Sequence, residues 1–146
     1  MIFIMGGREL AWHDLFNNIA TLASMEYQER YVIGGTAEEY LSIDNLVHDF
    51  LSSAEWAKHQ ANRGKFLPSH LAAIEELYSF LVAVCDEALN AKSFEEVGPL
   101  VRDEPVWAEI RAKAASTLSL LGISITDVPV EELDEHEWEY PLNIAR

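Results

Sequence analysis

One long apolar stretch, from Ser69 to Asn90, constrains the fold more than any other part of the chain. Its apolar residues recur at alternating steps of three and four, the spacing of one helical face. These residues are Leu71, Ile74, Tyr78, Leu81, Cys85 and Ala88. Other apolar residues fill most of the remaining circumference and leave only a narrow polar stripe. A helix that is apolar nearly all round needs neighbours on every side. The sequence therefore predicts a central helix over 69–90, enclosed by the others.

An earlier helix is predicted to begin at Glu9 and either to end near Ser24 or to continue through Tyr27. Its apolar face is formed by Trp12, Leu15, Phe16, Ile19, Leu22 and Ala23. The opposite face carries His13, Asp14, Asn17, Asn18 and Thr21. An apolar stripe with a polar opposite face is typical of a helix at the surface. We expect this helix to pack by one stripe.

Capping signals divide the rest of the chain. Thr36 to Glu39 and Ser52 to Glu55 match the capping box, and the second predicts a separate, shorter helix through Trp56. Ser93 to Glu96 is a third box, but Gly98-Pro99 should limit its helix to one turn. Pro68 is expected to begin the central helix.

The last long helix has the clearest boundaries. Asp103-Glu104-Pro105 combines acids with a first-turn proline, and Gly122 is a C-terminal cap. Its inward face is predicted to contain Trp107, Ile110, Ala114, Leu118 and Leu121. No two convincing strands exist to pair. The predicted fold is all-α: a single domain, 1–146, of four to five helices around the 69–90 helix, with an acidic C-terminal extension.

The charge balance favours a basic partner. The chain of 146 residues has 25 Asp and Glu against 10 Lys and Arg, a formal net charge of −15. This charge repels nucleic acid and anionic lipid. No stretch approaches the roughly 18 uncharged apolar residues of a membrane span, and the N-terminus lacks the features of an export signal. With a single cysteine, Cys85, the expected location is the reducing cytoplasm.

The acidic tail, residues 127–146, is the predicted partner-binding site. Seven carboxylates lie within 13 residues, beside apolar and aromatic side chains that purely solvating tails lack. We expect the carboxylates to steer a basic partner and the rings to pack against it. The predicted binding residues are Asp127, Glu131, Glu132, Asp134, Glu135, Glu137, Trp138, Glu139 and Tyr140. Alternatively, Trp138 and Leu142 hold the tail to the body, and both roles are compatible.

No catalytic or metal site emerges from the sequence. None of the five histidines forms a spaced pair that would bind zinc, and the Asp44/His48 and Glu55/His59 spacings are those of ordinary helix-surface contacts. Paired carboxylates such as Asp86-Glu87 and Glu95-Glu96 are interpreted as solvated helix faces. Cys85 is expected to be a buried, inert thiol. Lys58, Arg63 and Lys65 form the one basic cluster, too small for nucleic acid. Neither a cofactor nor a metal is predicted.

A resemblance adds a functional hypothesis. The segment from Asp103 to Ala115, closing at Leu121-Gly122, resembles a helix of small bacterial immunity proteins. Size, acidity and single-domain organisation are similar to immunity proteins of polymorphic toxin systems, including contact-dependent growth inhibition. The resemblance implies a non-enzymatic inhibitor that covers the active site or substrate cleft of a cognate basic toxin, often a nuclease. It carries over no individual site residue.

Two other functions remain open from the sequence. One is a metal-assisted hydrolase whose site is assembled from His48, His59 and helix carboxylates. The other is a helical regulatory or scaffold subunit that associates through Trp12 or Trp56.

Overall fold

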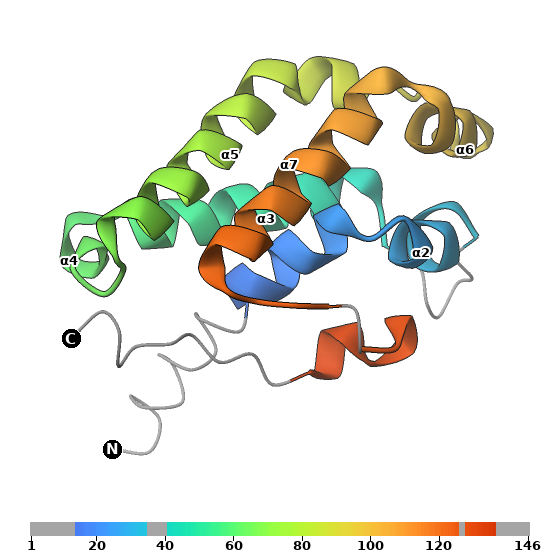
Figure 1. Cartoon of the computed structure of the whole chain (residues 1–146). Helices are drawn as coiled ribbons and strands as arrows, with labels where there is room; N and C mark the ends of the chain where they lie inside the picture. Colours follow the sequence, from blue (N-terminus) through green and yellow to red (C-terminus); the bar gives the residue numbers. More distant parts are fainter. Residues whose placement is uncertain (1–13, 35–40, 126–127, 137–146) are drawn as a thin grey trace.

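The computed structural model describes residues 14–34, 41–125 and 128–136, and within them the chain is helical with no strand (Figure 1). The all-α prediction is confirmed. The longer helices are residues 14–23, α3 (Ile43–Lys58), α5 (Pro68–Ala88), α6 (Phe94–Asp103) and α7 (Pro105–Leu121). The short elements are α2 (Met25–Tyr27), the π-helix η1 (Gln28–Ile33), α4 (Gln60–Arg63) and the 3₁₀-helix η2 (Val130–Glu135).

The helix predicted to be central, α5, begins at Pro68 as expected and packs against both α3 and α7 (Figure 1). The prediction that it is enclosed on all sides is wrong, because Val82 is 52% exposed and Phe80 and Val84 are only partly buried. Its buried face contains Leu71, Ala73, Ile74, Leu77, Leu81 and Ala88. A small domain has too little polar surface to cover itself, so one apolar helix face can remain outside. In the described part of the chain, no helix is long and apolar enough to cross a bilayer.

Residues 14–23 pack by the predicted apolar stripe and leave Asp14 exposed, but their polar face is more covered than a surface helix predicts. Leu15, Phe16, Ile19, Ala20 and Leu22 are completely buried, and on the polar face Thr21 is only 3% exposed. The Asn18 amide donates hydrogen bonds to the Asp49 carbonyl (3.0 Å) and the Ser53 hydroxyl (2.7 Å). Helical periodicity identified the apolar face, but it carries no information about what covers the polar one.

One predicted helix boundary is absent. α3 begins after Ser42, whose hydroxyl accepts a hydrogen bond from the Asn45 N–H at 3.1 Å, and it continues to Lys58. The expected new helix at Ser52 to Glu55 does not form, because the apolar stripe of α3 continues in register to Ala54 and Ala57, both fully buried. The Thr36 to Glu39 box lies outside the described residues.

The helix α6 is longer than the single turn predicted. It continues through Gly98-Pro99 to Asp103, because Val97, Leu100 and Val101 are buried on one face and offset the hydrogen bond that Pro99 removes. At its start, the Glu96 carboxylate accepts from the Lys92 backbone N–H at 2.9 Å.

The helix α7 agrees with its predicted boundaries. It begins at Pro105 and ends before Gly122, whose φ of 75° is the left-handed conformation that glycine adopts most easily. The five residues predicted to face inward are all buried. Trp107 is completely buried, and its indole Nε1–H donates to the Ala88 carbonyl at 2.9 Å. This bond joins the end of α5 to the start of α7.

A buried glutamine connects the N-terminal elements to α6 and α7. The Gln28 amide nitrogen donates to the carbonyls of Thr21 and Leu22 (2.9 Å each), which are among the last of helix 14–23 and lack helical partners. The Gln28 amide oxygen accepts from Arg111 Nη1 at 2.9 Å, and the same nitrogen donates to the Val101 carbonyl at 2.9 Å. One side chain thus provides hydrogen-bond donors for two carbonyls at a helix end and orients an arginine.

Candidate functional site

The predicted binding site in the acidic tail is described in part. Pro129 precedes η2. Glu131, Glu132, Asp134 and the backbone of Glu135 belong to η2. The remaining predicted binding residues lie outside the described residues: Asp127, Glu137, Trp138, Glu139 and Tyr140.

Leu133 and Asp134 hold η2 to the body, and Val130 is also packed against the hydrophobic core. Leu133 is 2% exposed. The Asp134 carboxylate accepts from Asn17 Nδ2 at 2.9 Å and from the Tyr27 hydroxyl at 2.9 and 3.2 Å. Burial, and then the negative charge of Asp134, raise the pKa of Tyr27 far above its ordinary value. The predicted anchors Trp138 and Leu142 lie outside the described residues, whereas Leu133 and Asp134 perform this role within them.

The outward side of η2 displays two glutamates. Glu131 lies 4.0 Å from Arg30, with both side chains about half exposed (55% and 50%), so water screens this pair strongly. Glu132 is exposed, and its side chain makes no hydrogen bond or ion pair with another described residue. Both carboxylates are therefore accessible to a cationic surface, while Asp134 is occupied within the protein.

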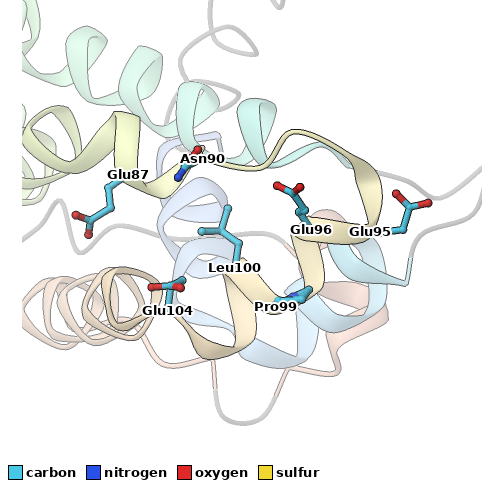
Figure 2. A pocket seen from close by; sticks show the side chains of 7 residues that line it. All are labelled: Glu87, Asn90, Glu95, Glu96, Pro99, Leu100 and Glu104. Atoms are coloured by element: carbon cyan, nitrogen blue, oxygen red, sulfur yellow. The ribbon is translucent and has the colours of Figure 1, made fainter.

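A second acidic feature is a groove at the corner where α5, α6 and α7 meet. It has a volume of about 340 Å³ and is lined by Glu87, Asn90, Glu95, Glu96, Pro99, Leu100 and Glu104. Figure 2 shows Leu100 between Glu87 and Glu104 on one side and Glu96 on the other. We call this feature the glutamate groove.

Helix ends assemble the glutamate groove. Glu87 is in the last turn of α5, and Glu95 and Glu96 are in the first turn of α6. Glu104 is the residue between α6 and α7, held extended (φ −77°, ψ 132°) because Pro105 follows it. The sequence interpretation of Glu87, Glu95 and Glu96 as solvated acids, and of Glu104 as part of a helix start, missed the groove. The available signal was four glutamates at three successive helix ends within 18 residues.

Three of the four glutamates are unpaired. Glu96 accepts the Lys92 N–H, but the side chains of Glu87, Glu95 and Glu104 make no hydrogen bond or ion pair with another described residue. The contrast is Glu29, whose pKa is lowered by hydrogen bonds from Arg102 at 2.8 and 3.1 Å.

The basic cluster, Lys58, Arg63 and Lys65, lies at the other end of the molecule, around α4 (Figure 1). Each of its three side chains contacts another residue. Arg63 Nη1 pairs with Glu75 at 2.9 Å. The Lys58 ammonium lies 3.6 Å from the centre of the Tyr78 ring, and the Lys65 ammonium lies 5.5 Å from the centre of the Trp56 ring. These three bases therefore lie away from the glutamate groove.

The residues proposed for metal chemistry are not brought together. His48 and His59 are eleven positions apart along α3 and its C-cap, a separation of about 16 Å at the helical rise of 1.5 Å per residue. His59 instead caps α4, where its Nδ1 accepts from the Ala61 N–H at 3.1 Å. Among the described residues, no three His, Cys, Asp or Glu side chains are placed to hold a metal ion.

Cys85 is only partly buried, whereas the sequence predicted a buried thiol. Burial, followed by the charges of Asp86 and Asp44, raises the pKa of its thiol. A raised pKa reduces the thiolate fraction at neutral pH, and the thiolate is the reactive form.

Comparison with protein-family models, with curated proteins and with solved structures finds no match for this chain.

Proposed function

We propose that this chain is an acidic binding protein that neutralises a cognate basic protein, such as a toxin domain, by covering its active site or substrate cleft. The observation that carries the proposal is the acidic segment η2, which is held to the body by Leu133 and Asp134 while Glu131 and Glu132 remain accessible. In this proposal the protein acts in the cytoplasm by covering a site on its partner, and it has no reaction or cofactor of its own.

Electrostatics supports this mode of binding. A net charge of −15 attracts a basic surface at long range and accelerates encounter. A nuclease cleft is built to receive phosphates, and fixed carboxylates offer it the same sign of charge. Attachment of η2 to the body reduces the ordering cost that a free tail pays on binding.

The test uses the protein encoded directly upstream in the native host as the partner, and measures association at 20 and at 200 mM NaCl. The tail variant replaces Glu131, Glu132, Glu137 and Glu139 with Gln and leaves the Asp134 contacts intact. We expect at least a tenfold fall in the association rate at low salt, with little change in the unfolding midpoint. Salt should diminish this difference, because it screens exposed charges.

The matched control removes the same charge from exposed positions on the helices, with D44N, E76Q, D86N and E109Q combined. This control should keep an association rate within threefold of the parent. Equal slowing by both variants would contradict the tail as the interface. Failure of the parent protein to bind or inhibit the upstream product would contradict the function.

A further inference from the structure

We infer that Arg30 is a built-in competitor of the basic partner. Its guanidinium occupies, beside the Tyr31 ring and Glu131, the place that an arginine side chain of the partner takes on binding. The inference rests on the proposed function and adds an autoinhibitory contact to the same site. It depends on the position of Arg30, on the ring beside it and on the weakness of its ion pair.

Arg30 reaches the acidic segment from a separate element. It belongs to the π-helix η1, which directly follows α2, and Figure 1 shows η2 just below α2. Arg30 Nη1 lies 4.0 Å from Glu131 Oε2 of η2. The residue before it, Glu29, pairs instead with Arg102 of α6. The chain therefore places one of its ten basic residues against the segment proposed to bind a basic partner.

An aromatic ring lies on the other side of the guanidinium. Arg30 Cζ is 5.4 Å from the centre of the Tyr31 ring, inside the roughly 6 Å range of a cation–π contact. The Tyr31 ring packs against the Tyr27 ring, with 4.8 Å between centres, and the Tyr27 hydroxyl donates to Asp134 of η2. The ring is therefore held in position beside the acidic segment. A ring face next to a carboxylate suits the planar guanidinium of arginine better than the compact ammonium of lysine.

The contact is weak enough to be exchanged. A separation of 4.0 Å is longer than the roughly 2.7–2.9 Å of a charge-assisted hydrogen bond, and the two side chains are 50% and 55% exposed. The Arg102–Glu29 pair, at 2.7 Å, has the short distance that the Arg30–Glu131 pair lacks. Exposed ion pairs stabilise a fold only slightly, so an incoming arginine can replace Arg30 at little cost. Removal of Arg30 should therefore raise the affinity for such an arginine by about two- to fivefold.

Two simpler roles of Arg30 predict different results. If Arg30 serves to hold η2 to the body, its removal weakens binding at η2. If Arg30 acts only through the net charge, removal of any other partly exposed arginine strengthens binding equally. Competition alone predicts stronger binding that is specific to Arg30 and that requires Glu131.

The test uses a defined probe, the peptide Ac-Gly-Arg-Gly-Arg-Gly-NH₂, in a ¹⁵N-edited NMR titration of the full chain at 20 mM NaCl. We expect saturable shifts in the amides of residues 27–33 and 130–135, and an affinity two- to fivefold higher for R30Q than for the parent. The variant R30Q/E131Q should return to the parent affinity or below it. The same peptide with citrulline in place of arginine is uncharged, and its binding should not improve in R30Q.

The matched control is R63Q, which removes one positive charge from another partly exposed pair, Arg63–Glu75 at the α4 end. It should change the peptide affinity by less than about 1.5-fold. An equal gain in both variants would assign the effect to net charge, and weaker binding by R30Q would assign Arg30 to holding η2. Either result overturns the inference, as does the absence of saturable shifts at η2. The proposed function is tested separately, because failure of the parent to inhibit the upstream product contradicts it whatever Arg30 does.

Discussion

Gln28 shows what a single residue contributes to this fold. Its amide completes the end of helix 14–23 and holds Arg111, whose pKa is lowered by burial, against the Val101 carbonyl. Nothing in the sequence around Gln28 predicts this role. It depends on the interruption between two helices at Ser24 and on a helix more than 80 residues away. Trp107 is the opposite case, since helical spacing alone placed it in the core.

Tyr27 provides a prediction at the residue scale. Burial and Asp134 raise the pKa of its phenol above the ordinary 10.0. Above pH 10 the folded chain therefore retains a proton that the unfolded chain releases, and stability falls as pH rises, by up to about 1.4 kcal/mol per pH unit from this group. In Y27F this contribution should vanish.

The measurement is urea unfolding of both proteins between pH 8 and 11. At pH 8 the variant should be less stable by about 1–2 kcal/mol, because it lacks the hydrogen bond to Asp134. The difference should then shrink as pH increases. A constant difference across the range would contradict the assignment.

At the scale of elements, boundaries set by backbone chemistry were predictable and those set by packing were not. Pro68, Pro105 and Gly122 determine local dihedral angles, so the start of α5 and both ends of α7 follow from the sequence. α3 and α6 continue through a capping signal and a proline because their buried stripes outweigh local preference. The same limit applies to the candidate sites, since the tail is a local feature and the glutamate groove is assembled from three helices.

The attachment of η2 gives a prediction at this scale. L133A removes the most buried apolar side chain of η2, and we expect a loss of about 1–3 kcal/mol in the free energy of unfolding. Because η2 can detach while α3, α5 and α7 stay packed, faster hydrogen exchange should be confined to residues 123–136 and to α2. L120A is the control, since Leu120 is 58% exposed and its replacement should change little. Faster exchange throughout α5 and α7 would contradict an independently detachable segment.

At the scale of the whole molecule, charge opposes compactness. The net charge is −15, and the salt bridges within the described residues are partly exposed, so repulsion among the acids is compensated only in part. Composition alone predicted this excess. It did not predict its uneven distribution, which depends on which helix ends become neighbours.

Ionic strength should therefore stabilise the protein. Between about 10 mM and 150 mM NaCl the Debye length falls from about 30 to 8 Å, which screens long-range repulsion. We expect the melting temperature to rise by a few degrees, equivalent to about 1 kcal/mol. Choline chloride should act like NaCl if screening is the cause. A fall in melting temperature with either salt would show that attractive pairs dominate.

The separation of the α4 end, with its bases, from the groove end, with its unpaired acids, gives the molecule an electric dipole moment as well as a net charge. A cationic surface exerts a torque on such a body while the two are still separated by solvent. For the basic partner proposed above, we expect this torque to turn the ends of α5 and α6 forward, so that a larger share of collisions begins in a productive orientation than random tumbling would provide.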